Sequence, residues 1–489
     1  MNLTQVFILS FLAIIAGCLI PKRWRIWFLL TSSLFSIYWL QPSSPIRNLD
    51  FWFPTVSILL TLFVWIITQK ENQKNKRALF TTIAVIIGII LFIGLTRYFN
   101  PSFYLTASRP PGLFQIMIVL GLGMALASLP AIFPNKRFWS IFSIAFIIFL
   151  FILQKTELFA QNSSAFLRTL NGQSPELASH LDLTWLGFSY LAFRLIHVIR
   201  DYQMGKLPTY SLAEFATYAL FFPTYTAGPI DRSQRFMGDL PERQSITNQK
   251  EANTQHYVLY QTKENFLIGA QRIIVGIFMK FVLADSLALI ALNEQNASQV
   301  SSSFWMWVLL VSYALRIFFD FSGYTDIAIG LGRFMNFRLP ENFDRPYTKK
   351  NLTEFWNSWH ITLAQWFRAY YFFPLTRTLR TKLRKFPAWS IIFIGQFSTM
   401  AFIGLWHGIN WNFFIWGIWH GTGLFIHNRW LDWTRKNSSN FVRSGVVGLA
   451  LDFASWLLTF SFVTVGWVWF ALPNLAQSWQ VIQTLLTIR

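Results

Sequence analysis

Long apolar stretches recur along the chain, and short polar segments separate them. Each stretch is close to the length of about 20 residues that a helix needs to cross the hydrocarbon core of a bilayer. The pattern therefore predicts an all-α polytopic membrane protein with about 11–13 transmembrane helices. The apolar stretches lie at residues 6–20, 26–40, 51–68, 78–95, 113–132, 138–153, 183–199, 212–225, 266–292, 304–331, 391–405, 413–426 and 446–472.

Composition supports the same class. Of 489 residues, 54% are hydrophobic and only 13% are charged, whereas soluble domains are roughly one quarter charged. The lipid bilayer is therefore the expected surroundings of the chain. The single cysteine, Cys18, excludes a disulfide framework, and no Cys/His spacing typical of a metal site occurs.

The formal net charge of +20 does not predict nucleic-acid binding, because the basic residues lie in short loops between apolar stretches. Alternate loops differ in positive charge. The loop after the first stretch holds Lys22, Arg23 and Arg25, whereas the loop after the second holds Arg47 alone. The more basic loops are expected in the cytoplasm, which places the N-terminus outside.

No linker or repeat divides the chain, so we expect one membrane domain over residues 1–489. Residues 1–180 read as peripheral apolar helices, 181–430 as a functional core and 431–489 as a C-terminal helix. The division rests on polar residues that interrupt the apolar sequence from residue 221 onward, because such residues are costly at membrane depth unless they face protein or a water-filled cavity.

Two interruptions come first along the core. In residues 221–232, two prolines and a glycine predict irregular backbone, either a re-entrant segment or a plain helix stop before the polar stretch 233–264. In the apolar stretch 304–331, Arg316 and Asp320 lie one helical turn apart and can pair, and Tyr324 follows. A structural ion pair or cap is the competing interpretation of these charges, and we place all three residues at a cavity.

Aromatic residues recur at helical spacing over residues 355–373, which predicts an amphipathic interfacial helix. Asn357, Trp359 and His360 lie in this segment. We expect the first two to line a cavity. From chemistry alone His360 is a candidate only, because a histidine among aromatic residues is more often part of a core.

A further polar interruption spans residues 404–412 and contains Trp406, His407 and Asn410. A neutral imidazole at pH 7 can take a proton from a hydroxyl and return it, so His407 is the leading candidate for a general base. His420 and His427 are expected to be structural or cavity-lining, since they are too far apart on a helix for one metal. No metal site is predicted.

Five stretches in this order resemble the membrane-bound O-acyltransferase family, in particular its bacterial branch of alginate O-acetyltransferases and D-alanyl transfer proteins of teichoic acid synthesis. The resemblance covers residues 183–427. It implies a ring of helices around a central cavity in a bacterial inner membrane, with His407 essential and His360 important. Ala369 departs from the family, which commonly has an aspartate there. The stretches are FPTYTAGPIDR, FFDFSGYTDIAIGLGR, PENFDRPY, LTEFWNSWHITLAQWFR and GLWHGINWNFFIWGIWHG.

The resemblance also implies the reaction. A hydroxyl would attack the carbonyl of a thioester, supplied by acyl-CoA or an acyl carrier protein as substrate, with no bound cofactor. His407 and His360 are the expected catalytic residues, and Asn410 and Trp406 would help to orient the substrates. An extracytoplasmic polysaccharide is the expected acceptor, and a carrier protein or an extracytoplasmic transferase is the expected protein partner.

Other functions stay open from the sequence. Within the same chemistry they are D-alanyl transfer to a teichoic-type polymer and acylation of a lysophospholipid. Outside it they are a transporter or flippase of envelope precursors, which would favour internal repeats, and a non-catalytic assembly partner.

Overall fold

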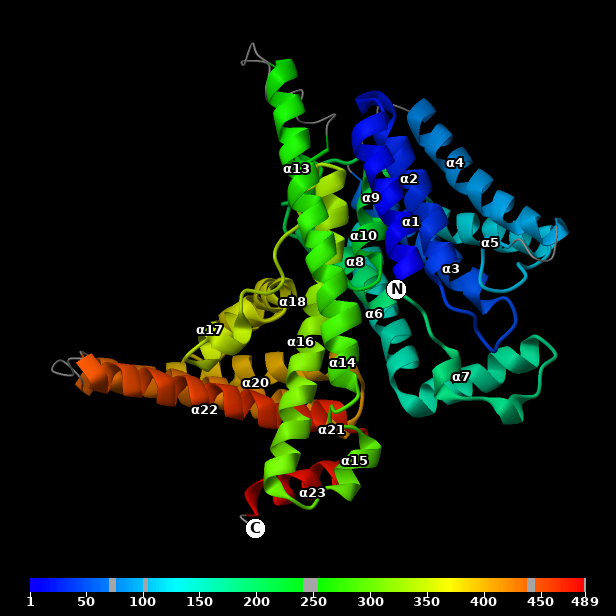
Figure 1. The fold of residues 1–489 in the computed structure, drawn as a ribbon. Coiled ribbons are helices and arrows are strands. Elements are labelled where there is room, and N and C mark those ends of the chain that lie inside the picture. The colour runs from blue at the N-terminus through cyan, green and yellow to red at the C-terminus, as the bar shows by residue number, and fades with distance from the viewer. Residues whose placement is uncertain (70–75, 100–103, 241–253, 438–444, 488–489) are drawn as a thin grey trace. The chain divides into compact units, whose positions relative to one another are not determined.

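The computed structural model describes residues 1–69, 76–99, 104–240, 254–437 and 445–487. Every regular element within these ranges is helical, which confirms the all-α class (Figure 1). Eight helical stretches in the described ranges are long and apolar enough to cross a membrane. Other predicted spans form shorter helices, such as α1 (Leu3–Ile14), α8 (Phe188–Gln203) and α9 (Leu212–Ala219). The number of helices in the described ranges that meet the length and hydropathy requirement is therefore lower than the expected 11–13. The eight stretches are Leu49–Thr68, Lys76–Tyr98, Leu113–Pro130, Lys136–Lys155, Lys263–Ala288, Ser303–Phe334, Ala388–His407 and Gly445–Ala471.

Contacts divide the chain into two compact units. Unit 1 comprises residues 1–274 and 327–340, and unit 2 comprises residues 275–326 and 341–489. The boundary passes through two long helices, α13 (Thr254–Ile277) and α16 (Ser303–Phe334). Apart from these two, the helices of unit 1 are α1, α2 (Lys22–Leu40), α3 (Leu49–Thr68), α4 (Lys76–Leu95), α5 (Leu113–Ile132), α6 (Lys136–Lys155), α7 (Glu157–Leu170), α8, α9, α10 (Phe222–Tyr225) and α11 (Ser233–Gly238), with short helical turns η1 (Ile15–Leu19), η2 (Thr96–Tyr98), η3 (Pro175–Leu177) and η4 (His180–Asp182).

Unit 2 contains the remaining helices, and several of them are short. The region expected to form one C-terminal helix contains two, α22 and α23. The elements of unit 2 are η5 (Phe278–Ala284), α14 (Asp285–Ala288), α15 (Glu294–Gln299), η6 (Pro346–Thr348), α17 (Leu352–Ser358), α18 (Ile361–Phe367), η7 (Arg368–Phe372), α19 (Phe373–Lys382), α20 (Ala388–His407), α21 (Trp411–Asn437), α22 (Gly445–Ala471) and α23 (Leu475–Leu486).

The helix break predicted at residues 221–232 is present in unit 1. α9 ends at Ala219, the four-residue α10 follows, and α11 starts at Ser233. Arg194 on α8 is 1% exposed and stabilises the break, because its guanidinium donates to the backbone carbonyls of Ala219 at 2.8 Å and Thr224 at 2.5 Å. A break leaves carbonyl oxygens without their helical donors, and one buried side chain replaces those donors here.

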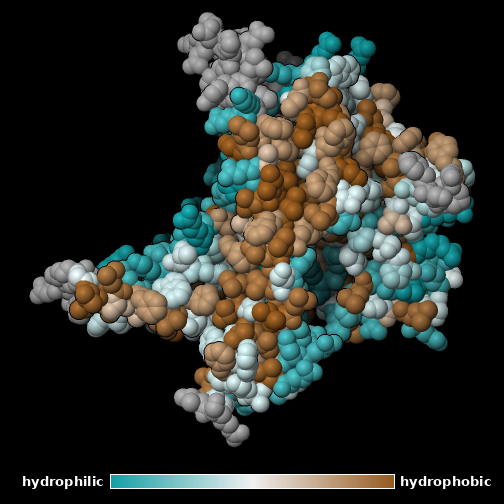
Figure 2. All heavy atoms as spheres, viewed as in Figure 1, coloured by the Kyte–Doolittle hydropathy of each residue, from teal (hydrophilic) through white to brown (hydrophobic). Residues whose placement is uncertain are grey.

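Glycines let α13 and α16 approach each other closely. A Cβ atom on Gly330 would lie 2.7 Å from the carbonyl oxygen of Gly269, and one on Gly323 would lie 2.7 Å from that of Gly276. Both pairs are seven residues apart on their helices, so they lie on one face, as in small-residue packing of membrane helices. Figure 1 shows the two helices side by side. α13 exposes apolar side chains such as Phe266, Leu267 and Ile274, which suits lipid contact, and Figure 2 shows an apolar surface over the lower part of this helix.

We predict that Gly323→Ala and Gly330→Ala each lower the free energy of unfolding by about 1–3 kcal/mol, because the added methyl group forces two backbones apart. Thermal unfolding in detergent measures the change. Gly88→Ala on α4 is the control, since no atom lies within 4 Å of its Cβ position, and alanine there should be neutral or stabilising. Equal melting temperatures for all three variants and the wild type would contradict close packing of the two helices.

Candidate active site

His360 lies at a break between two short helices. The predicted single helix over residues 355–373 is wrong, because α17 ends at Ser358 and α18 begins at Ile361. The backbone of His360 has φ +43°, in the left-handed region that few residues other than glycine adopt. The strain is held by neighbouring contacts, as is common at functional sites.

Asn342 provides those contacts. Its backbone carbonyl accepts a hydrogen bond from the amide of Ile361 at 2.9 Å. Its side-chain oxygen accepts from the amide of Thr362 at 3.2 Å and from the hydroxyl of Thr362 at 2.9 Å, and it lies 3.1 Å from Nδ1 of His360. One buried asparagine therefore fixes both the backbone at the break and the ring of His360.

The contact with Asn342 also sets the tautomer of His360. The Asn342 oxygen is an acceptor, so Nδ1 of His360 must carry the proton and Nε2 must present its lone pair. The ring is 3% exposed, and Nε2 has no hydrogen-bond partner within the described residues. Burial lowers the pKa of His360, which lies outside all eight candidate spans, to about 3. His360 is therefore a neutral imidazole able to accept a hydrogen bond.

His407 is the last residue of α20 and is half-buried among aromatic rings. Its ring centroid lies 4.8 Å from that of Phe470, 5.5 Å from that of Trp416 and 5.9 Å from that of Phe413. The aromatic walls come from α21 and α22, so three helices of unit 2 hold the imidazole.

Close packing of α20 and α21 positions His407. A Cβ atom on Gly404 would lie 2.1 Å from the carbonyl oxygen of Phe413, so only glycine fits one turn before the histidine. The side-chain oxygen of Asn410 accepts a hydrogen bond from the amide of Phe413 at 2.9 Å. Asn410 thus caps the start of α21, and its side chain is exposed.

Trp406 brings the two histidines into one site. Its indole ring lies edge-to-face to both, with centroids 4.6 Å from His407 and 6.1 Å from His360. The other side of His360 is covered by Phe321 of α16, at 4.7 Å. The sequence predicted both histidines and Trp406, and the fold places all three together although 47 residues separate His360 from His407.

The other predicted cavity residues are distributed more widely in unit 2. Trp359 is buried in an aromatic cluster, where it stacks on Phe355 at 5.7 Å and contacts Trp467 at 5.0 Å. Tyr324 is buried within α16. Asn357 is exposed and accepts a hydrogen bond from Arg368 at 2.8 Å.

The expected pairing of Arg316 with Asp320 is wrong. The partner of Asp320 is Lys280, which belongs to the π-helical turn η5. A π-helical turn changes the angular position of the side chains that follow, and here it brings a lysine to the face of α16 that carries Asp320. Arg316 forms no ion pair within the described residues.

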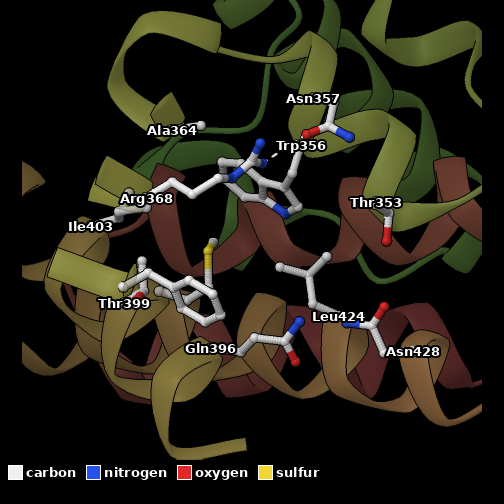
Figure 3. Close-up of a pocket in the computed structure, with 12 residues that line it drawn as sticks. Thr353, Trp356, Asn357, Ala364, Arg368, Gln396, Thr399, Ile403, Leu424 and Asn428 are labelled. Carbon is white, nitrogen blue, oxygen red and sulfur yellow. Dashed lines mark hydrogen bonds between the residues drawn. The ribbon is translucent and has the colours of Figure 1, made fainter. Parts of the chain in front are cut away.

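A pocket of about 190 Å³ lies next to this site in unit 2. Trp356 and Ile403 connect the two, because Trp356 contacts Trp416, which packs against His407, and Ile403 precedes His407 by one helical turn. Figure 3 shows Arg368 extending past Trp356 to Asn357 at the rim. The pocket is lined by Thr353, Trp356, Asn357, Ala364, Arg368, Phe372, Gln396, Thr399, Met400, Ile403, Leu424 and Asn428.

Comparison with known proteins decides the family. The family model described as MBOAT, membrane-bound O-acyltransferase family, matches residues 131–470, a range that contains both histidines and the pocket. The chain belongs to the membrane-bound O-acyltransferase family. The family resemblance expected from the five motifs is thereby confirmed.

The chain is similar to proteins of three named functions. It is 32% identical to a "Probable alginate O-acetylase" of Pseudomonas aeruginosa over 65% of this chain and 54% of that protein. It is 33% identical to a "Peptidoglycan O-acetyltransferase" of Helicobacter pylori over 56% and 47%, and 36% identical to a "Teichoic acid D-alanyltransferase" of Streptococcus thermophilus over 51% and 58%. The chain spans about half the length of these curated relatives.

Sequence reasoning missed several residues of the site. Asn342 lies inside a quoted motif, but its role depends on a contact with residues 18 and 20 positions later. The contacts of Trp416 and Phe470 with His407 were also not predicted, because one aromatic residue in an apolar helix does not indicate a functional site. A polar residue between prolines and aromatic residues, as in 340–347, is the one pattern that pointed toward Asn342.

We predict that Asn342→Ala lowers the free energy of unfolding by about 2–4 kcal/mol, because buried donors of Thr362 and His360 lose their acceptor. Thermal unfolding of purified protein measures this. Asn357→Ala is the matched control, since its side chain is exposed and the expected change is below about 1 kcal/mol. Similar losses for the two variants would contradict the role assigned to Asn342.

The lowered pKa of His360 predicts a pH-dependent contribution to stability. The unfolded imidazole takes up a proton near pH 6.5, whereas the folded one does so only near pH 3. Stability from the neutral folded ring is thus complete above pH 6.5 and falls as the pH drops below it, by about 2 kcal/mol at pH 5. The stability difference between the wild type and His360→Gln should shrink by this amount between pH 7.5 and 5. A constant difference would show that His360 is not held neutral.

Proposed function

We propose that this chain is an O-acyltransferase that moves an acyl group, acetyl in the first instance, from a thioester to a hydroxyl of an extracytoplasmic glycan. The donor is acyl-CoA or an acylated carrier protein. The observation that carries the proposal is the common contact of His360 and His407 with Trp406, inside the range matched by the acyltransferase family. Two of the relatives are named as O-acetyl-transferring proteins, which supports the acetyl group.

His407 acts as the general base in this proposal. The acceptor oxygen attacks the thioester carbonyl carbon while His407 takes the hydroxyl proton, and the carbon–sulfur bond then breaks as His407 returns the proton to the sulfur. His407 is suited to this work because it is half-buried, so substrates can reach it, and aromatic rings on α21 and α22 fix its position.

His360 has a different part. Its Nε2 presents a lone pair, and its burial keeps it uncharged. A neutral acceptor of this kind orients a hydroxyl by accepting its hydrogen bond but is too weak a base to hold the proton. The ring of Trp406 limits the space around the reacting groups. Asn410 contributes indirectly, because its side chain caps the start of α21.

The cellular setting follows from the same proposal. The chain lies in the bacterial inner membrane as a multi-pass protein with the N-terminus outside, which puts the basic loops in the cytoplasm. There they face the thioester donor, which is an acidic carrier protein or coenzyme A. An extracytoplasmic transferase is the second partner that this arrangement would serve.

D-alanyl transfer is the second candidate, because the relative in Streptococcus thermophilus is 36% identical. D-alanyl transfer would use the same histidines as acetyl transfer and would differ from it in the acyl group that is moved. Acylation of a lysophospholipid is a third reading of the same chemistry, and transport of envelope precursors would require neither histidine.

We predict that His407→Ala lowers ester formation by at least about 10²-fold, and that His360→Ala lowers it less, because the base does more of the chemistry than the orienting group. Equal amounts of each variant are produced in membranes. Ester-linked acyl groups are then released from envelope glycans and lipids by mild alkali and identified with their carriers by mass spectrometry.

His180→Ala, an exposed histidine of unit 1, is the matched control and should behave as wild type. The carrier of the released group distinguishes glycan from teichoic-type polymer and lipid. Full activity in both His407→Ala and His360→Ala would overturn the proposal and leave transport as the leading function.

A further inference from the structure

A short segment of unit 2 is strongly basic. Residues 377–385 hold five cationic side chains and no carboxylate, and the nearest acidic residues in the sequence are Glu354 and Asp432. All five cations are exposed, and none forms an ion pair within the described residues. We refer to them as the basic strip, which consists of Arg377, Arg380, Lys382, Arg384 and Lys385.

Large aromatic side chains flank the basic strip on both sides. Phe373 before it is 54% exposed, and Phe386 and Trp389 after it are 53% and 49% exposed. Trp389 lies in the first turn of α20, which is one of the eight candidate membrane spans. Exposed aromatic rings at the end of a span are typical of the zone where lipid headgroups meet the hydrocarbon.

Packing fixes the helix that carries the first three cations of the strip. α19 contacts η7 and α20. Thr376 is buried against Gly395 of α20, where a Cβ atom would lie 2.7 Å from Cγ2 of the threonine. Arg377 and Arg380 follow Thr376 on α19, and both are exposed.

We propose that the basic strip and its flanking aromatic residues bind the headgroups of anionic phospholipids. The five exposed cations lie on α19 and on the segment that joins it to α20, a candidate span. An anionic leaflet attracts such juxtamembrane cations, while the neighbouring rings enter the interface. An acidic protein is the competing partner, but exposed aromatic residues next to a span would be covered by lipid first.

Lipid bound at the strip also bears on the neighbouring pocket. α19 continues directly from η7, which carries Arg368 and Phe372, and it packs on α20, which carries Gln396 and Met400. Headgroups that bind α19 would therefore also restrict the movement of η7 and α20, which form two walls of that pocket. This consequence is independent of which acyl group the protein transfers.

The test measures lipid binding by the full-length protein in detergent. Phosphatidylglycerol and phosphatidylcholine are titrated separately, and bound lipid is counted by native mass spectrometry. We expect the wild type to bind phosphatidylglycerol at least fivefold more tightly than phosphatidylcholine, with the preference reduced in high salt. The triple variant Arg377→Gln, Arg380→Gln, Arg384→Gln should lose most of this preference.

Two further variants make the outcome decisive. Lysine at the same three positions should retain the preference, because headgroup attraction depends on charge. Glutamine at Arg23, Arg77 and Arg137, which are exposed in unit 1, should also retain it. The proposal is overturned if the strip variant binds phosphatidylglycerol as the wild type does. It is equally overturned if the strip variant loses binding to a purified acyl carrier protein while its lipid preference is unchanged.

Discussion

A helix that breaks among apolar surroundings leaves backbone amides and carbonyls that need new partners, and the arrangement of this protein depends on how they are found. In unit 1, the guanidinium of Arg194 donates to the carbonyls of Ala219 at the end of α9 and of Thr224 in α10. In unit 2, Asn342 serves the amides at the start of α18. Each break therefore costs little, and each makes a stretch of irregular backbone available at a fixed place.

The second break, between α17 and α18, contains His360 and so forms part of the candidate active site. Because Asn342 accepts from both the backbone and Nδ1 of His360, the contact that stabilises the break also fixes the proton on the ring. His407 is placed differently, by the glycine contact between α20 and α21 and by aromatic rings. One histidine is thus set by hydrogen bonds in a buried position, and the other by packing in a more open one. The difference suits an orienting group and a base.

Much of the fold class could be predicted from apolar length alone, and the helix break at 221–232 from its prolines and glycine. His407 and Trp406 were predicted from the polar interruption at residues 404–412, whereas His360 was a candidate only and gained its expected role from the family resemblance. The pairing of Asp320 with Lys280 could not be predicted, because the π-helical turn that aligns them has no sequence signature at the level of periodicity. Likewise, the aromatic spacing over 355–373 indicated one helix, and only a contact with a residue far away in sequence breaks it at His360.

The indole of Trp406 has a consequence for how such a site changes over time. Since one ring contacts both imidazoles, a smaller or larger side chain there alters the surroundings of both at once. Adaptation of the site to a bulkier acceptor or acyl group cannot then proceed by independent single steps at each histidine. Compensating changes at Phe321, which contacts His360, or at Phe470, which contacts His407, would have to accompany it. The effect of a substitution near one histidine on substrate choice is therefore expected to depend on the residues near the other histidine. Residue 406 couples the two, because its side chain contacts both imidazoles.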